Sequence, residues 1–143
     1  MKVQQDLGVA ERISNRPEFI EPALFHCQQA AEKAIKGFLL FHEVHFEKTH
    51  DIGRLLRQAA AISPHLLSLL VEAEGLTIHA AATRYPRILI PPLEAADRDM
   101  ALSHARAITR TMLALLPPEV RPEGIALIDP SDEPGSHSAG QMP

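Results

Sequence analysis

Apolar residues recur at spacings of three and four positions through most of residues 3–116. This period places them on one side of an α-helix and is typical of amphipathic helices. The period is clearest in residues 21–42, where the apolar stripe consists of Cys27, Ala31, Ala34, Phe38 and Phe41. No segment shows the alternation of a strand bounded by hairpin turns. The pattern therefore predicts an all-α protein.

Prolines divide this pattern into about five helices, because proline interrupts a helix anywhere beyond its first turn. Ser63-Pro64 separates two of them, and Ser63 is the expected N-cap of the second of this pair. Pro117-Pro118 ends the last helix. The expected helices cover about residues 3–14, 21–42, 50–62, 63–83 and 94–116.

Composition limits the class of protein. The chain has 143 residues, 45% of them hydrophobic and 22% charged, which suits one globular domain. Its single cysteine, Cys27, excludes an internal disulfide and favours a reducing compartment. No apolar run approaches the roughly 20 residues of a membrane span, and the amino terminus lacks a hydrophobic signal core. We therefore expect a cytoplasmic protein whose one thiol is buried and structural.

The charge is unevenly distributed. Residues 1–116 contain 13 basic and 13 acidic side chains, whereas residues 117–143 contain one basic and five acidic ones and account for the net charge of −4. Six of the twelve prolines also lie in residues 117–143. We predict a helical domain over residues 1–116 and a flexible, proline-rich, acidic tail over residues 117–143. The neutral domain does not favour strong nucleic-acid binding, which usually accompanies a basic domain.

The second and fourth expected helices are apolar over more than one narrow face. Such helices need more than one neighbour to cover them. In a chain of this size a second copy is the economical cover, and two-fold dimers are the commonest oligomers. We therefore expect a homodimer.

Three ordered motifs carry a resemblance to a known family. The second expected helix contains Gln28-Gln29-Ala30-Ala31-Glu32-Lys33-Ala34-Ile35-Lys36, and Thr49-His50-Asp51 and Arg84-Tyr85-Pro86 follow it. Asp6-Leu7 and Ala10 match the first helix of the same family. Over about residues 3–116 the chain resembles the HEPN family. The resemblance implies an up-and-down helical bundle that dimerises. Members are commonly encoded beside an MNT-type nucleotidyltransferase as a toxin–antitoxin pair. Many relatives are metal-independent ribonucleases that use an Arg-x4–6-His motif across the dimer.

Within the second expected helix, four polar residues form a stripe beside the apolar one: His26, Gln29, Lys33 and Lys36. One hypothesis is a solvated or interface-rim face, which is the usual role of a charged stripe. The other is a cradle for a phosphate or nucleotide, or for a protein partner, with Arg84 and Tyr85 as further contacts. For Thr49 and Asp51 we favour helix capping, although His50 with Asp51 resembles an oriented imidazole.

A metal-free ribonuclease needs a base for the 2′-hydroxyl and a cation for the phosphorane. Arg98 and His104 form the one literal Arg-x5-His match, yet on a continuous helix they point about 120° apart. They share a site only if Arg98 lies in an unwound first turn or acts across a dimer. If the relevant arginine is Arg84 instead, no histidine follows it within reach and the catalytic site is degenerate.

Three functions therefore stay open: a module that binds nucleotide or RNA and an MNT-type nucleotidyltransferase, a ribonuclease that uses Arg98 and His104, and an antitoxin-like subunit whose tail folds on its partner. No metal signature accompanies the eight histidines, and we expect neither a metal nor another cofactor.

Overall fold

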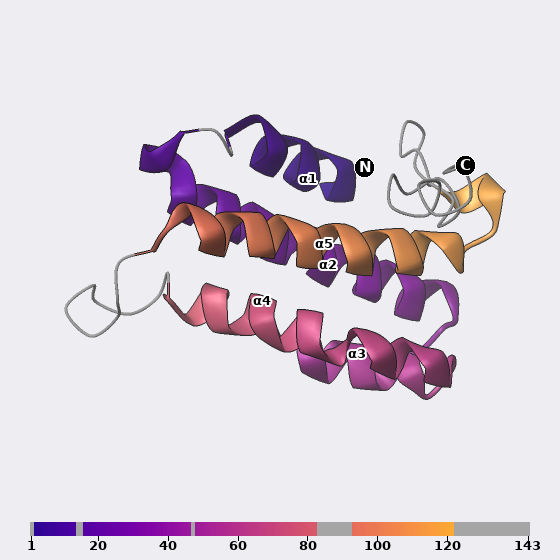
Figure 1. The fold of residues 1–143 in the computed structure, drawn as a ribbon. Coiled ribbons are helices and arrows are strands. Elements are labelled where there is room, and N and C mark those ends of the chain that lie inside the picture. The colour runs from indigo at the N-terminus through magenta and orange to yellow at the C-terminus, as the bar shows by residue number, and fades with distance from the viewer. Residues whose placement is uncertain (1, 14–15, 47, 83–92, 122–143) are drawn as a thin grey trace, which may run out of the picture.

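The computed structural model describes residues 2–13, 16–46, 48–82 and 93–121, and within this part of the chain it contains helices and turns but no strand. The prediction of an all-α protein is confirmed. The described residues form five α-helices (Figure 1), with one 3₁₀ turn between α1 and α2, one between α3 and α4, and one after α5. The α-helices are α1 (Lys2–Ile13), α2 (Ile20–Phe41), α3 (Ile52–Ala60), α4 (Leu70–Ala82) and α5 (Ala95–Ala114), and the 3₁₀ turns are η1 (Pro17–Phe19), η2 (Pro64–Leu69) and η4 (Pro118–Val120).

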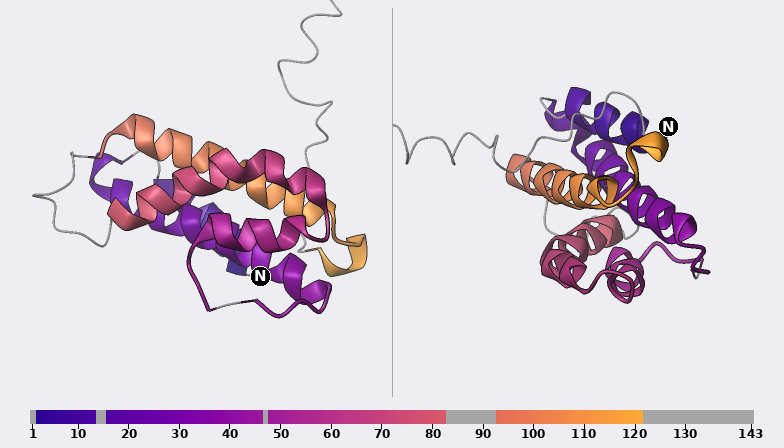
Figure 2. Two further views of the ribbon diagram at one scale, coloured as in Figure 1. Left: turned by 90° about the horizontal axis from the view of Figure 1, so that it is seen from below. Right: turned by 90° about the vertical axis from the view of Figure 1, so that its right-hand side faces the viewer.

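Helix α2 is the centre of the bundle and contacts each of the other four α-helices. It runs in the same direction as α5, whereas α1 and α4 run in the opposite direction (Figure 1). The end-on view places α1 on one side of the α2–α5 pair and α3 with α4 on the other (Figure 2). The core between these layers is mostly aliphatic, and its largest fully buried side chains include Leu24, Ile35, Phe38, Leu39, Ile52, Leu55, Leu56, Leu76, Ile108 and Met112.

Most helix ends lie within two residues of their predicted positions, but the fourth helix differs. Residues 64–69 form the 3₁₀ turn η2, and the α-helix begins only at Leu70. Ser63 has the extended backbone of an N-cap, but its side chain makes no capping hydrogen bond, so its predicted capping role is wrong. A 3₁₀ turn bonds residue i to i+3, and the amide of Leu66 accordingly bonds to the backbone carbonyl of Ser63.

The end of α5 also differs from prediction. Pro118–Val120 forms a 3₁₀ turn, although we expected no helical structure after residue 116. The turn brings the Arg121 guanidinium back to the helix, where it donates to the carbonyls of Leu116 (2.8 Å) and Ala114 (3.1 Å). Such carbonyls at a helix end lack partners within the helix. Ordered structure therefore extends through Arg121. Residues 122–143, most of the predicted tail, lie outside the described residues.

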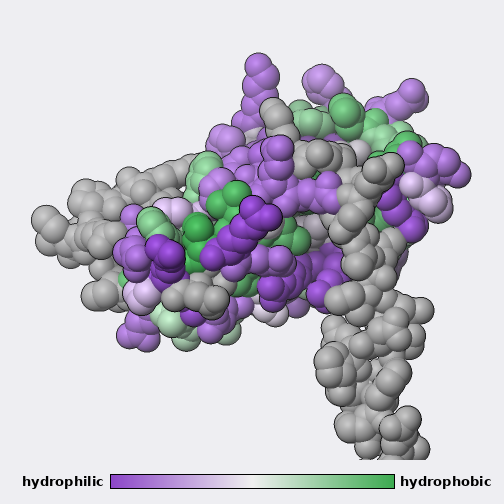
Figure 3. Space-filling model, turned by 90° about the horizontal axis from the view of Figure 1, so that it is seen from above, coloured by the Kyte–Doolittle hydropathy of each residue, from purple (hydrophilic) through white to green (hydrophobic). Residues whose placement is uncertain are grey.

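Several large apolar side chains are exposed on the described surface. Figure 3 shows apolar surface gathered in separate places on one face of the molecule, with hydrophilic surface between them. From α2, η2 and α4 the exposed side chains are Phe25, Leu40, Phe41, Leu67 and Val71. Among the described residues, no helix is both long enough and apolar enough to span a membrane.

Candidate functional site

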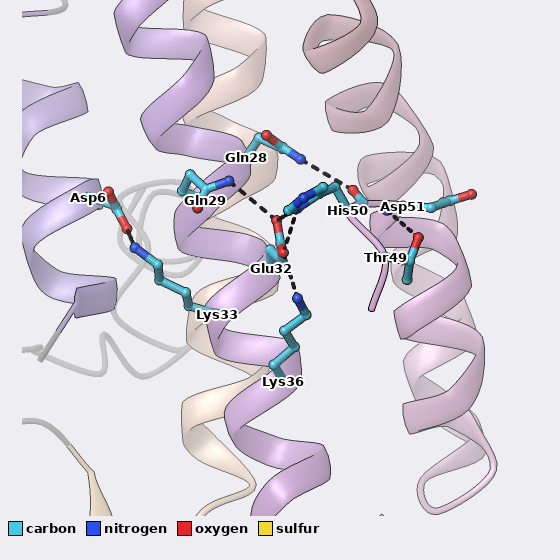
Figure 4. A network of polar contacts seen from close by, with 9 residues as sticks. All are labelled: Asp6, Gln28, Gln29, Glu32, Lys33, Lys36, Thr49, His50 and Asp51. Atoms are coloured by element: carbon cyan, nitrogen blue, oxygen red, sulfur yellow. Dashed lines mark hydrogen bonds and ion pairs between the residues drawn. The ribbon is translucent and has the colours of Figure 1, made fainter. Parts of the chain in front are cut away.

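The polar side chains of α2 meet α1 on one side and the turn before α3 on the other (Figure 4). Two buried carboxylates organise this region: Asp6 from α1 and Glu32 from the middle of α2. Carboxylates are rarely buried unless they are paired. Each of these two accepts hydrogen bonds from one lysine and one histidine. We call the whole set the polar network; it comprises Asp6, His26, Gln28, Gln29, Glu32, Lys33, Lys36 and His50.

Asp6 joins α1 to α2. The Nδ1 atom of His26 lies 2.8 Å from one of its carboxylate oxygens. The Nζ atom of Lys33 donates to the other oxygen. Because His26 and Lys33 are seven residues apart, they lie on one side of α2, two turns from each other. One carboxylate therefore spans two turns of the neighbouring helix and fixes how α1 lies against it.

Glu32 joins α2 to the turn before α3. Its Oε1 atom accepts from Lys36 Nζ at 2.7 Å and from His50 Nδ1 at 2.9 Å. Its Oε2 atom accepts from Gln29 at 3.3 Å, and His50 Nδ1 lies 3.2 Å from the same oxygen. One turn before Glu32 in α2, Gln28 donates to the backbone carbonyl of His50 at 3.2 Å. These bonds hold the turn before α3 against the middle of α2, although the chain leaves that helix at Phe41.

The carboxylates determine the tautomers of the two histidines. An ionised carboxylate only accepts hydrogen bonds, so Nδ1 of His26 and of His50 must carry a proton and donate it. The Nε2 atom of each neutral ring then keeps a lone pair. Both imidazoles are therefore held in one orientation, and Nε2 of each can accept a hydrogen bond.

The turn before α3 has two roles. Asp51 Oδ1 accepts from the amide of Arg54 at 3.1 Å, and Thr49 Oγ1 accepts from the amide of Asp51 at 3.1 Å. The preference for capping is thus confirmed for Asp51, whereas Thr49 bonds to the amide of the cap residue and stabilises the turn before α3 rather than the helix itself. His50 is also an oriented imidazole, but the carboxylate that orients it is Glu32 rather than its neighbour Asp51.

The structure divides the four residues of the predicted polar stripe between two neighbouring clusters along α2, one around Asp6 and one around Glu32. His26 and Lys33 contact Asp6, while Gln29 and Lys36 contact Glu32. From the sequence, Asp6 and Glu32 were named only within the motifs that carry the family resemblance, and neither of them was assigned a site role. The contacts of Asp6 lie 20 and 27 residues away, so periodicity within one helix gives no signal for them.

The remaining predicted site residues are Arg84, Tyr85, Arg98 and His104. Arg84 and Tyr85 fall outside the described residues. Arg98 lies in regular helix, because α5 begins at Ala95 behind a capping box formed by Glu94 and Asp97. The unwound first turn that would have joined Arg98 to His104 within one chain is therefore absent from α5. The Arg98 guanidinium pairs with the adjacent Asp99 at 3.2 Å.

His104 packs against α4. A methyl group in place of the Gly75 hydrogen would lie 3.1 Å from both Cδ2 and Nε2 of the His104 ring. The His104 ring therefore packs against α4 at a position where only glycine leaves enough space. A site that combines Arg98 with His104 needs a second copy of the chain.

Cys27 does not belong to any reactive pair. It is fully buried, and this burial raises the pKa of its thiol from 9.0 to about 12, although Arg106 nearby acts to lower it. A thiol with so high a pKa is a poor nucleophile at neutral pH. The prediction of a buried structural thiol is confirmed. Among the described residues, no group of three or more histidine, cysteine, aspartate or glutamate side chains is arranged to hold a metal ion.

Comparison with known proteins identifies the family. The family model of the HEPN domain matches residues 4–115. The chain belongs to the HEPN family. Searches of the curated proteins and of the solved structures found no significant match. The HEPN match runs from α1 through α5, so the whole polar network lies inside the domain. Residues 117–143 lie outside it.

Proposed function

We propose that this HEPN protein acts in the cytoplasm as a homodimer in a toxin–antitoxin-type pair, binds a nucleotide or RNA, and works with an MNT-type nucleotidyltransferase. The observation that carries the binding proposal is the polar network. Two buried carboxylates each hold one lysine and one imidazole beside α2, Asp6 on the side of α1 and Glu32 on the side of the turn before α3. The side chains of a solvated face need not be held in fixed positions by buried partners. A phosphate site, in contrast, needs donors that are already positioned.

The exposure of these groups supports the same proposal. Lysines form good point contacts to phosphate and have three donors each, of which the carboxylates occupy only one. Both lysines and both histidines retain exposed side-chain surface. Donors therefore remain at the surface for a bound anion.

Nucleotide binding is tested by titrating the purified full chain with ATP, AMP and a single-stranded RNA at about 0.1 M salt in EDTA. We expect saturable binding that Lys33→Met or Lys36→Met weakens by roughly tenfold, since a hydrogen bond to a charged group contributes about 1.5–3 kcal/mol. Arg57→Met is the matched control, because it removes one positive charge from an exposed pair with Glu74 outside the network. Equal affinities for the wild type and both lysine variants would contradict the proposed site.

The MNT-type partner needs a separate test. We expect the chain to co-elute with the MNT-type nucleotidyltransferase of the same genome when the two are co-expressed and separated by size at micromolar concentration. Independent elution of the two proteins would contradict the partnership without affecting the nucleotide-binding result.

The ribonuclease hypothesis is distinguished in the same samples. Cleavage of the RNA in EDTA by the wild type, and its loss in His104→Ala, would favour the catalytic function over the binding function. Because α5 is regular from Ala95, our proposal is that Arg98 and His104 do not form a catalytic unit within one chain.

A further inference from the structure

The turn η2 and helix α4 form one continuous helical segment with two apolar sides. On the outer side, Leu67 is 51% exposed and Val71 is 75% exposed. The side that faces the bundle is buried, and its residues are Leu66, Leu69, Ala73 and Leu76. A helix that is apolar on two sides needs a cover for each of them. The bundle covers the inner side, whereas the outer side has no cover within the described part of the chain.

Leu67 and Val71 lie together and are called the outer patch. Among the large apolar side chains exposed in the described residues, only these two are four positions apart in one helical segment, and they therefore lie on adjacent turns. Leu40 is 69% exposed, but the residue four positions before it is Lys36. Single exposed apolar residues are normal on a protein surface, whereas contiguous ones mark interaction sites. The outer patch is thus the better candidate for an interface.

The helix itself does not explain a valine at position 71. Valine favours the α-helix less than alanine, leucine or the charged residues do, because its branched side chain loses rotamer freedom there. Its apolar surface stabilises a structure only where another surface removes it from water. Val71 therefore favours a partner that buries it.

The charges beside the outer patch suit a second copy of the chain. Glu74 follows Val71 by one turn, and its carboxylate accepts from the Arg57 guanidinium of α3 at 3.0 Å. Both of these side chains are about half exposed. Because the pair contains both signs, two copies can approach without net repulsion, and each charge can find an opposite one on the partner. A strongly acidic or strongly basic partner would match only one of them.

We propose that two copies of the chain associate through the outer side of η2 and α4, about a two-fold axis that passes close to Val71. The inference rests on the proposed homodimer and specifies its interface. Leu67 and Val71 of both copies form the apolar centre, and the pairs of Arg57 with Glu74 lie at the rim. The polar network contains no residue of η2 or α4, and α1 and α4 lie on opposite sides of the α2–α5 pair (Figure 2). A dimer through the outer patch therefore leaves the α1 side of the network uncovered.

The two-fold axis allows a sharp test, because residue 71 of one copy then lies beside residue 71 of the other. Val71→Glu and Val71→Lys each place like charges at the axis. Each should weaken dimerisation at least roughly hundredfold, since an unpaired charge buried in an interface is costly. An equimolar mixture of the two variants should regain a mass near twice 15.7 kDa, because opposite charges meet in the mixed dimer. Light scattering of the full chain over a dilution series measures both effects.

Crosslinking locates the axis independently. Val71→Cys introduces an exposed thiol, whereas the native Cys27 is fully buried with a pKa raised to about 12 and stays unreactive at neutral pH. A short bifunctional thiol reagent should join most Val71→Cys chains in pairs at micromolar concentration. Leu40→Cys is the matched control, because Leu40 is similarly exposed but belongs to α2. It should give little crosslinked product, and the wild type should give none.

The outcomes separate the interface from the dimer. A wild-type mass of one chain at micromolar concentration overturns the proposed homodimer itself. A dimer that persists in both charged variants, or that crosslinks through residue 40 and not through residue 71, overturns this interface but leaves the homodimer in place. A mixture of the charged variants that stays monomeric overturns the position of the axis. Thermal melts establish that each variant is folded.

The same variants reveal a different occupant of the outer patch. If Val71→Glu stays dimeric but no longer co-elutes with the MNT-type nucleotidyltransferase, the patch binds that partner and the proposed interface is overturned.

Discussion

At the scale of single residues, the choice between the candidate functions depends on how the histidine side chains are oriented. His26 and His50 donate through Nδ1 to buried carboxylates and keep Nε2 available, whereas His104 lies against Gly75 of α4. Arg98 and His104 satisfy the spacing of a ribonuclease motif but not its geometry within one chain. The difference arises because spacing along a helix specifies direction, and six residues turn the chain by about 600°, which is about 120° short of two full turns.

The first prediction concerns ribonuclease activity across a dimer. If two copies build the site, Arg98→Ala and His104→Ala should each abolish cleavage in EDTA, the latter by roughly 100- to 10,000-fold, the usual effect of a general base. Refolding an equimolar mixture of the two inactive variants should restore roughly a quarter of the wild-type rate, because half of the random dimers are mixed and each contains one intact site. Arg98→Lys should recover only part of the activity. An inactive mixture of two variants that remain dimeric would exclude this arrangement.

The second prediction concerns Cys27. Because burial raises the pKa of its thiol to about 12, the native protein should react very slowly with a thiol reagent at pH 8 and rapidly in denaturant. The folded pKa lies above the unfolded value, so the contribution of this thiol to stability is complete below about pH 9 and is lost as the pH rises from about 9 to 12. Denaturation curves across that range measure the loss. Rapid labelling of the native protein at pH 8 would show that the thiol is accessible.

At the scale of secondary-structure elements, helix ends and helix contacts depend on a few specific side chains. Asp51 caps α3, Glu94 and Asp97 form the capping box of α5, and Arg121 covers its last carbonyls. The contact between α4 and α5 depends on a glycine. Without a side chain, Gly75 allows the His104 ring to approach the α4 backbone.

The third prediction compares two glycines that both lie inside helices. Gly37→Ala should stabilise the protein by about 1 kcal/mol through helix propensity, since nothing lies within 4 Å of the added Cβ. Gly75→Ala should gain less or destabilise, because its Cβ would lie 3.1 Å from the His104 ring. In a His104→Ala background the full gain should return at residue 75. Urea denaturation of the four variants measures this coupling, and a Gly75→Ala gain equal to that of Gly37→Ala would contradict the close packing.

The fourth prediction concerns the end of the folded domain. Truncation after Arg121 should leave the melting temperature nearly unchanged, because loosely attached termini contribute little. Truncation after Leu116 removes the two Arg121 hydrogen bonds to α5 and should cost about 1–2 kcal/mol, or several degrees. Arg121→Ala in the full chain should reproduce most of that loss. A large loss on truncation after Arg121 would instead show that residues 122–143 pack on the bundle.

At the scale of the whole molecule, the exposed apolar side chains have no cover within the described part of one chain. Leu40 is 69% exposed and Val71 is 75% exposed, at positions where amphipathic helices usually place polar residues. A homodimer would cover such positions, and the ribonuclease hypothesis requires one as well. The dimer is a proposal that the fold of one chain leaves open.

The fifth prediction tests this proposal. Light scattering at micromolar concentration should give a mass near twice the 15.7 kDa of the chain. Replacement of the exposed Val71 or Leu40 by glutamate should shift the mass towards the monomer if that position lies in the interface, because a buried unpaired charge is costly. Asp99→Ala, at an exposed polar position of α5, serves as the control for altered charge. A monomer mass for the wild type would contradict the homodimer.

Much of the architecture followed from the sequence by itself. The period of its apolar residues determined that the chain is helical, and its prolines determined where most helices begin and end, because both act through local backbone geometry. The same local reasoning placed His26, Gln29, Lys33 and Lys36 on one side of one helix, and it identified Asp51 as the cap of α3.

Only the tertiary structure determined which residues of other elements that polar side contacts. It brought Asp6 across from α1 and His50 back from the turn before α3, over separations of 18 to 27 residues. It also placed His104 against Gly75 and thereby separated it from Arg98. Contacts of this kind depend on which faces of different helices meet. Periodicity reports the faces of one helix, but the pairing of faces is set by packing of the entire core.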